Sequence, residues 1–255
     1  MDNRNRSRKR QRHEAKYLIT EAQAAEIRRY CMAHLPLDPH SAHEPGYEYP
    51  VLSVYLDSPA RELLRSAIDR RVDRYKLRVR TYRRHNAPLD GLPAFSEIKR
   101  KSHGVVRKTR AQVEPGLAEE LLWKEHFGFG RRGEYDVHMR MSVDEFVRLR
   151  NRINAGPVIG VSYLREAYEG SSVERIRVTL DRNLHYGLLA SPGSGLGETW
   201  WPAGTGGVIL EVKFTNTYPF WVADMLRRVE VLRRGVCKYV ICTRAAGTFQ
   251  RRAFG

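Results

Sequence analysis

The segment KLRVR at positions 76–80 places Lys76, Arg78 and Arg80 at every second residue. Successive side chains of a β-strand point to opposite faces, so a strand here has one cationic face and one aliphatic face. The same alternation occurs in EIKRK at 97–101, RIRVTLD at 175–181 and LEVKF at 210–214. The sequence therefore predicts a sheet with one strongly basic side.

Such alternation also has an ordinary explanation, because a half-exposed sheet with solvated polar side chains gives the same pattern. Here, however, Arg and Lys recur on several strands with few acids opposite. Like charges that face each other across a sheet destabilise strand pairing, and an anion lying among them removes that repulsion. We therefore expect a closed antiparallel β-barrel, flanked by helices, whose basic lumen is a tunnel for a polyanion.

The composition also favours a polyanionic partner. Of the 255 residues, 45 are Lys or Arg and 29 are Asp or Glu, which gives a formal net charge of +16. Nucleic acid, acidic lipid and phosphate chains all fit this excess, and charge alone does not choose among them. No segment is apolar and long enough to span a membrane, and the three cysteines lack disulfide or zinc-ligand spacing. A cytoplasmic protein is the simplest interpretation.

The order of predicted elements indicates an α+β protein. Strand pairs prevail over strand-helix-strand units, which argues against a doubly wound sheet. We expect one domain at 12–244, between a disordered basic tail at 1–11 and a polar tail at 245–255. Ser142 and Glu145 form a capping-box pattern that predicts a helix start, and the segment 236–243 is predicted to be the last strand.

Standard nucleotide-binding and hydrolase motifs are absent from the sequence, including GxxxxGK[ST], HExxH and GxSxG. Phosphate contacts must then come from dispersed bases, of which Arg grips two phosphate oxygens and Lys supplies a compact charge. Arg78, Arg80, Arg165 and Arg177 suit the first role, and Lys16, Lys101 and Lys238 are among the residues that suit the second. Further substrate-binding residues are expected at Lys76, Lys99, Lys108, Arg110 and Lys213.

Three acids, Glu14, Glu97 and Glu211, lie two residues from one of these bases and so share a strand face with it. Each could hold a divalent metal ion or pair with a neighbouring Lys or Arg. Pairing is the default for Glu97. Glu211 is the better metal candidate, with Glu14 as a second ligand, because a carboxylate beside a polyphosphate supports Mg²⁺ or Mn²⁺ that bridges phosphate oxygens.

Seven segments, taken in order, resemble the catalytic domain of the vacuolar transporter chaperone (VTC) family. That domain is a polyphosphate polymerase of the CYTH, or triphosphate tunnel metalloenzyme, group. The segments are RHEAKYLI (12–19), KLRVRTY (76–82), FSEIKRKSH (95–103), SYLREAY (162–168), RVTLDRNL (177–184), ILEVKF (209–214) and CKYVICT (237–243). The resemblance implies a closed barrel whose lumen binds ATP and polyphosphate. It matches Glu211 to the family's metal-binding glutamate. It also matches the phosphate-binding positions, which it implies carry catalysis, to Lys16, Arg78, Arg80, Lys101, Arg165, Arg177 and Lys238.

Two positions depart from the pattern of this group. Members that hydrolyse triphosphates carry ExExK, whereas Arg12 occupies the first Glu position here, which argues against simple hydrolysis. Cys237 stands where the eukaryotic polymerase has a Ser before the final Lys.

The resemblance implies a metal-dependent phosphotransferase that moves the γ-phosphoryl group of ATP onto a growing polyphosphate. A triphosphatase of the same fold is one alternative. A non-catalytic module that binds polyphosphate or nucleic acid is the other, although no specific nucleic acid is expected. The sequence does not indicate a protein partner.

Overall fold

The computed structural model describes residues 12–82, 93–124, 136–171, 176–189, 199–217, 219–231 and 235–247. Its strands are β1 (Arg12–Ile19), β2 (Tyr49–Asp57), β3 (Arg74–Thr81), β4 (Ala94–Ser102), β5 (Val105–Val113), β6 (Gly156–Glu169), β7 (Arg177–Gly187), β8 (Trp200–Pro202) and β9 (Val208–Thr215). They form one antiparallel sheet in the order β1-β9-β7-β6-β2-β3-β4-β5, with the short β8 beside β7. The predicted α+β class with an antiparallel sheet is confirmed.

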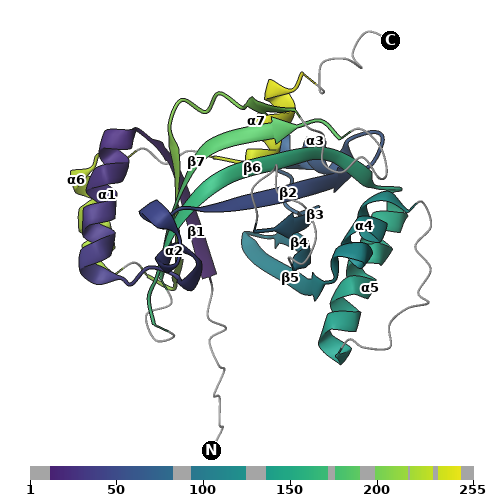
Figure 1. The fold of residues 1–255 in the computed structure, drawn as a ribbon, viewed down its shortest axis with the longest axis horizontal. Coiled ribbons are helices and arrows are strands. Elements are labelled where there is room, and N and C mark those ends of the chain that lie inside the picture. The colour runs from purple at the N-terminus through teal and green to yellow at the C-terminus, as the bar shows by residue number, and fades with distance from the viewer. Residues whose placement is uncertain are drawn as a thin grey trace, which may run out of the picture.

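Helices surround this sheet in three groups (Figure 1). They are α1 (Glu21–His34), α2 (Pro39–Ala42), α3 (Glu62–Ile68), α4 (Pro115–Trp123), α5 (Val137–Arg152), α6 (Phe220–Arg228) and α7 (Lys238–Ala245), with one 3₁₀ turn at Pro45–Tyr47. One apolar cluster joins α1 and α6 to β1, β7 and β9, and a second joins α4 and α5 to β3, β4 and β5. The aliphatic faces of the strands are thus buried under helices, which leaves their charged faces on the other side. In the described parts of the chain, no helix has the length and apolarity needed to cross a bilayer.

The sheet curls but does not close, so the prediction of a closed barrel is wrong. Strands β1 and β5 are its two edges, and no backbone pairing joins them among the described residues. Side chains cross the seam instead, because Lys99 on β4 donates to both carboxylate oxygens of Glu14 on β1 at 2.9 and 2.8 Å. Backbone pairing at this seam would bring Lys108 and Arg110 of β5 toward Lys16 of β1, and like charges oppose such pairing.

The segment predicted as the last strand is helix α7. Its β-branched and aromatic composition favours a strand, but its buried residues follow helical spacing, as at Tyr239, Cys242 and Thr243. The Tyr239 ring stacks on Tyr55 with a centroid distance of 4.7 Å, and its hydroxyl donates to Asp57 at 2.6 Å. Together with α3 and with residues of β2, β6, β7 and β9, α7 forms the third apolar cluster. This cluster fills one end of the concave side of the sheet.

Helix α5 begins before the predicted capping box. The side chain of Asp136 caps it by accepting from the Met139 amide at 2.9 Å, so Ser142 and Glu145 lie inside the helix. Glu145 instead accepts a hydrogen bond from Arg100 of β4 at 3.0 Å. The predicted tail at 1–11 and most of the tail at 245–255 lie outside the described residues.

Candidate active site

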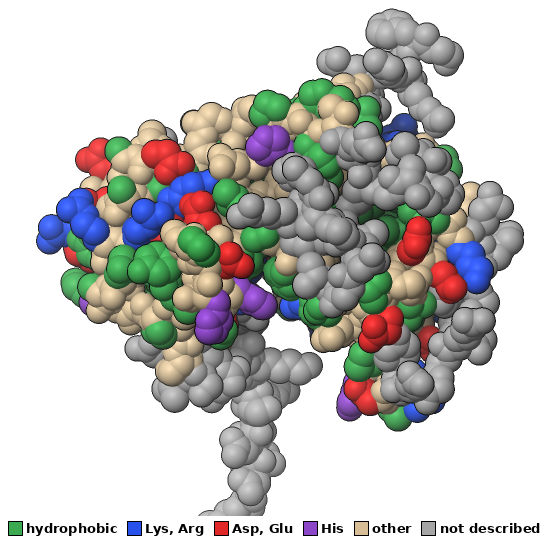
Figure 2. Space-filling view, viewed as in Figure 1, with side chains coloured by type: hydrophobic (Ala, Val, Ile, Leu, Met, Phe, Trp, Pro, Cys, Tyr) green, Lys and Arg blue, Asp and Glu red, His purple; other side chains and the backbone are tan. Residues whose placement is uncertain are grey.

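The concave side of the sheet contains a cavity of about 470 Å³. Side chains from eight strands and from the start of α7 line it, so segments far apart in the sequence converge there. The lining has eleven Lys and Arg side chains against three Glu. On the outer face over α1, by contrast, basic and acidic side chains lie next to one another (Figure 2), as in the ion pair of Arg29 with Glu26. The cavity therefore has an excess of positive charge that this outer face lacks.

Most of the predicted site residues come together in this cavity. Those that line it are Glu14, Lys16, Lys76, Arg78, Arg80, Lys99, Lys108, Arg110, Arg165, Arg177, Glu211, Lys213 and Lys238. Lys101 does not line it. Lys101 follows Lys99 on the same face of β4, but it is opposite Val106 near the turn into β5, at the end of the strand. The two-residue period gives the face of a residue and not its position along the cavity.

A buried carboxylate organises one wall of the cavity. Glu97 is fully buried, and it accepts from Nε of Arg78 at 2.7 Å and pairs with Nζ of Lys108 at 2.6 Å. Guanidinium nitrogens of Arg80 and Arg110 lie 3.9 and 3.6 Å from the same carboxylate. Burial raises the pKa of Glu97, but Arg78, Arg80 and Lys108 outweigh burial and hold it far below its ordinary value. Glu97 is thus ion-paired, as expected.

A second carboxylate, Asp181 on β7, organises the part of the lining that β6 and α7 supply. Arg165 grips it with two hydrogen bonds, from Nε at 2.6 Å and from Nη2 at 2.9 Å, and Lys238 Nζ lies 2.5 Å away. Burial raises the pKa of Asp181, but Arg165 and Lys238 lower it by more, so the net shift of the pKa is strongly downward. Asp181 was not predicted as a site residue. Its place in the alternating segment 175–181, directly opposite Arg165, is the signal that could have identified it.

Two tyrosine hydroxyls that were not predicted also hold the arginines in place. Tyr55 accepts from Nη1 of Arg78 at 3.1 Å, and Tyr163 accepts from Nη2 of Arg80 at 3.3 Å. The ammonium of Lys238 lies 4.6 Å from the centre of the Tyr163 ring. These contacts fix the guanidinium planes before any ligand arrives, which lowers the cost of binding.

Two further cations of the cavity, Arg177 and Lys76, have partners among the described residues. Arg177 pairs with Asp38 at 2.7 Å and with Glu169 at 2.9 Å. Lys76 Nζ lies 2.7 Å from the sulfur of Cys237. Burial raises the pKa of Cys237, but Lys76 outweighs it, so the net shift is downward.

Two carboxylates meet three lysines where β1 and β9 pair. Lys16 Nζ lies 3.1 Å from Glu14 Oε1 and 3.3 Å from Glu211 Oε2, and Lys213 Nζ lies 2.6 Å from Glu211 Oε1. Burial and Glu211 raise the pKa of Glu14, but Lys16 and Lys99 bring it down to about 2. Burial lowers the pKa of Lys16, whereas Glu211 and Glu14 raise it well above its ordinary value. Glu14 and Lys16 are therefore both charged at neutral pH.

This arrangement fits a divalent cation that is shared with a phosphate ligand. Among the described residues, no group of three or more His, Cys, Asp and Glu converges to hold a metal ion on its own. Mg²⁺ is commonly bound by one or two carboxylates together with phosphate oxygens and water, however. Glu14 and Glu211 supply two such carboxylates, and the Lys16 ammonium already stands between them as a cation. The donor set therefore suits Mg²⁺ or Mn²⁺ once a phosphate chain is present.

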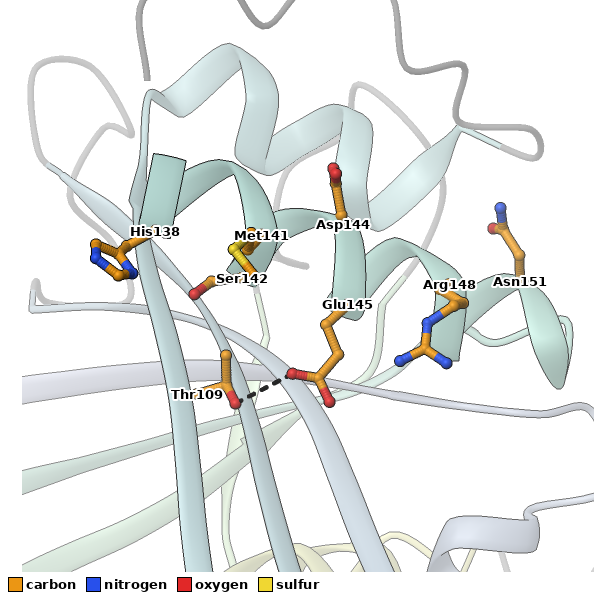
Figure 3. A pocket seen from close by; sticks show the side chains of 8 residues that line it. All are labelled: Thr109, His138, Met141, Ser142, Asp144, Glu145, Arg148 and Asn151. Carbon is orange, nitrogen blue, oxygen red and sulfur yellow. Dashed lines mark hydrogen bonds between the residues drawn. The ribbon is translucent and has the colours of Figure 1, made fainter. Parts of the chain in front are cut away.

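A second hollow, of about 1050 Å³, lies on the outer side of β5 (Figure 3). Seven of its lining residues come from α5, and Thr109 of β5 donates to Glu145 at 3.3 Å. Acidic and basic side chains are mixed there, as in Asp144, Glu145 and Arg148. Its lining has no cationic excess comparable to that of the concave cavity, so the concave cavity is the candidate active site.

A sequence model of the VTC domain family matches residues 11–246 of the chain. No curated protein matches the chain in sequence. Among solved structures, a Hippeastrum protein that was assigned as an adenylyl cyclase and has a dominant triphosphatase activity is 15% identical, with a TM-score of 0.51 and coverage of 92% of this chain and 95% of that chain. A Bacillus halodurans protein assigned as an adenylate cyclase is 14% identical, with a TM-score of 0.51 and coverage of 88% and 92%. At these identities the two likenesses establish a shared fold.

Proposed function

The chain belongs to the VTC domain family, and we propose that it is a polyphosphate polymerase that transfers the γ-phosphoryl group of ATP to the end of a growing polyphosphate. Family membership and the shared tunnel fold support a role in phosphoryl transfer. The observation that carries the proposal is the concave cavity, in which eleven Lys and Arg side chains surround a space of about 470 Å³. This volume lies within the range of roughly 300–1,000 Å³ that is usual for ligand sites.

The cavity supplies what phosphoryl transfer requires of a protein, namely positioning and charge neutralisation. Arg78 and Arg80 of β3 and Arg165 of β6 hold the phosphates of donor and acceptor. Lys238 adds a compact charge beside Arg165. Each guanidinium is oriented by a buried acid or a tyrosine hydroxyl, so little reorganisation accompanies the reaction.

In the reaction, an oxygen of the terminal phosphate attacks the γ-phosphorus of ATP. The bond from that phosphorus to the β–γ bridging oxygen breaks, and ADP leaves. A terminal phosphate has a second pKa of about 6, so it is ionised at neutral pH and needs no side-chain base. Glu211 and Glu14 are the residues that would hold Mn²⁺ or Mg²⁺, which would neutralise charge on the phosphate oxygens.

A product assay tests the proposal. Purified protein is incubated with ATP and Mn²⁺, and the products are separated by chain length. We expect ADP together with long phosphate chains. Orthophosphate as the sole phosphate product would instead identify a triphosphatase, and tight, salt-sensitive binding of polyphosphate without turnover would identify a binding module.

The affinity of the protein for polyphosphate should fall as the pH rises through about 8. Burial and neighbouring Lys16 lower the pKa of Lys99 to about 8, despite its pairing with Glu14. Below this pH Lys99 is protonated and attracts the anion, and above it the charge and the attraction are lost. We expect affinity to fall by up to about tenfold per pH unit above pH 8 as Lys99 loses its charge.

The control for this prediction is Lys99→Arg, which keeps the charge at all of these pH values. Fluorescence anisotropy with labelled polyphosphate should give a shallower pH dependence for the variant. Lys108, whose pKa is lowered to about 7 chiefly by burial, accounts for the remaining slope at lower pH. Identical pH profiles for the two proteins would contradict the assignment of Lys99 to the binding site.

A further inference from the structure

The ammonium group of Lys16 occupies the space between the two carboxylates that would hold a metal ion. Its Nζ atom lies 3.1 Å from Glu14 and 3.3 Å from Glu211, at nearly equal distances from both. Strand β1 lies beside β9 with Lys16 directly opposite Glu211 and Glu14 directly opposite Lys213. The strand register therefore sets each acid between two bases.

The remaining carboxylate oxygens of this cluster also have partners. Glu14 accepts from Lys99 through both oxygens, at 2.9 and 2.8 Å, and the second oxygen of Glu211 pairs with Lys213 at 2.6 Å. Three ammonium groups thus neutralise two carboxylates. A divalent cation that enters this cluster meets three positive charges at close range, and each of them repels it more strongly than it would in bulk water.

We propose that Lys16 is a built-in substitute for the metal ion, so that the site binds its divalent cation only after an oxyanion has drawn the Lys16 ammonium away. This inference rests on the proposed function, since it specifies how the same site is loaded. A phosphate chain in the cavity gives Lys16, Lys99 and Lys213 new acceptors. The two carboxylates are then free, and the phosphate supplies further oxygen ligands.

The chemistry of lysine makes this exchange feasible. The ammonium is a compact charge on a flexible stem of four carbons, so it can change partners without movement of the backbone. The Lys16 side chain is 21% exposed and lies on an edge strand, so it is not locked in place by packing on all sides. Free metal would therefore not occupy the cavity before substrate, and the order of loading follows from electrostatics.

Binding of Mn²⁺ alone tests the proposal without any turnover. The loss of the electron paramagnetic resonance signal of free Mn²⁺ is measured for the wild type, Lys16→Met and Lys76→Met. Lys76→Met removes an equal charge from the same cavity, but Lys76 contacts Cys237 and not the two acids. We expect Lys16→Met to bind Mn²⁺ at least about tenfold more tightly than the wild type, and Lys76→Met to change affinity by less than about threefold.

The double variant Lys16→Met with Glu211→Gln should return to the weak affinity of the wild type. Equal Mn²⁺ affinity of wild type and Lys16→Met, an equal gain in Lys76→Met, or a gain that survives Glu211→Gln would each overturn the proposal. A second measurement needs no variant. Sodium sulfate should strengthen Mn²⁺ binding to the wild type relative to sodium chloride at the same ionic strength, and no difference would count against the proposal.

These measurements are independent of the assignment as a polymerase. If Lys16→Met gains Mn²⁺ affinity but the ATP assay yields no chains, the proposal that Lys16 takes the place of the metal ion stands. The proposed polymerase activity then fails. If chains form but Mn²⁺ affinity is unaffected by Lys16→Met and by sulfate, the proposed activity stands. The proposal that Lys16 takes the place of the metal ion then fails.

Discussion

Replacing Glu211 by Gln should reduce the rate of polyphosphate synthesis by about a thousandfold or more. The variant keeps the shape of the side chain but removes the charge that would hold the metal ion beside the phosphates. Metal ions supply several kcal/mol of charge stabilisation in phosphoryl transfer, and about 4 kcal/mol corresponds to a thousandfold in rate. The rate is measured from ADP release at saturating ATP, over a range of Mn²⁺ concentrations.

The matched control is Glu145→Gln, which removes an ion-paired carboxylate on the outer side of the sheet. Its rate should stay within about twofold of the wild type, since substitutions of exposed pairs have small effects. Thermal unfolding of both variants establishes that they are folded. A Glu211→Gln protein that is folded and retains wild-type turnover would contradict the assignment of Glu211 as a metal ligand.

Substitution of both Arg78 and Arg80 should have the next largest effect. In the double variant Arg78→Lys with Arg80→Lys, both charges remain while both guanidinium forks are lost. Each charged hydrogen bond is worth about 1.5–3 kcal/mol, so the loss of one bond from each residue should lower the rate about a hundredfold or more. The control is Arg107→Lys, because Arg107 is exposed and lies on the opposite face of β5 from Lys108.

Substitution of the same pair by Ala tests how the cavity is held together. Glu97 would remain buried with only Lys108 and Arg110 as partners. Breaking a buried ion pair from one side typically costs about 3–5 kcal/mol, so the free energy of unfolding should fall by a comparable amount. Chemical denaturation measures this change. Full turnover in the Lys double variant, or an unchanged midpoint in the Ala double variant, would contradict the geometry described above.

The basic face of the sheet could be predicted from sequence because it depends only on strand alternation. Once Lys76, Arg78 and Arg80 occur at alternate positions, any strand through them has a cationic face. The resemblance in seven ordered segments then gave the family, which the match over residues 11–246 confirms. Strand alternation and this resemblance together also predicted Lys16 and Glu211 as candidate site residues.

Features that depend on long-range packing could not be predicted in this way. The segment at 236–243 has the composition of a strand, but as a helix it packs Tyr239 against Tyr55 and donates a hydrogen bond to Asp57. Closure of the sheet depends on whether β1 can pair with β5, a contact between segments about 90 residues apart. The anchoring roles of Asp181, Tyr55 and Tyr163 depend on the strand pairing that brings each of them to an Arg of another strand, and alternation within one strand does not give that pairing.

A structure of the protein with bound tripolyphosphate tests the central claim most directly. We expect the phosphate chain to lie in the concave cavity, with oxygens within hydrogen-bonding distance of Arg78 and Arg80 of β3, of Arg165 of β6 and of Lys238 of α7. An anion bound only on the outer surface, with the cavity side chains still paired as they are here, would contradict the account.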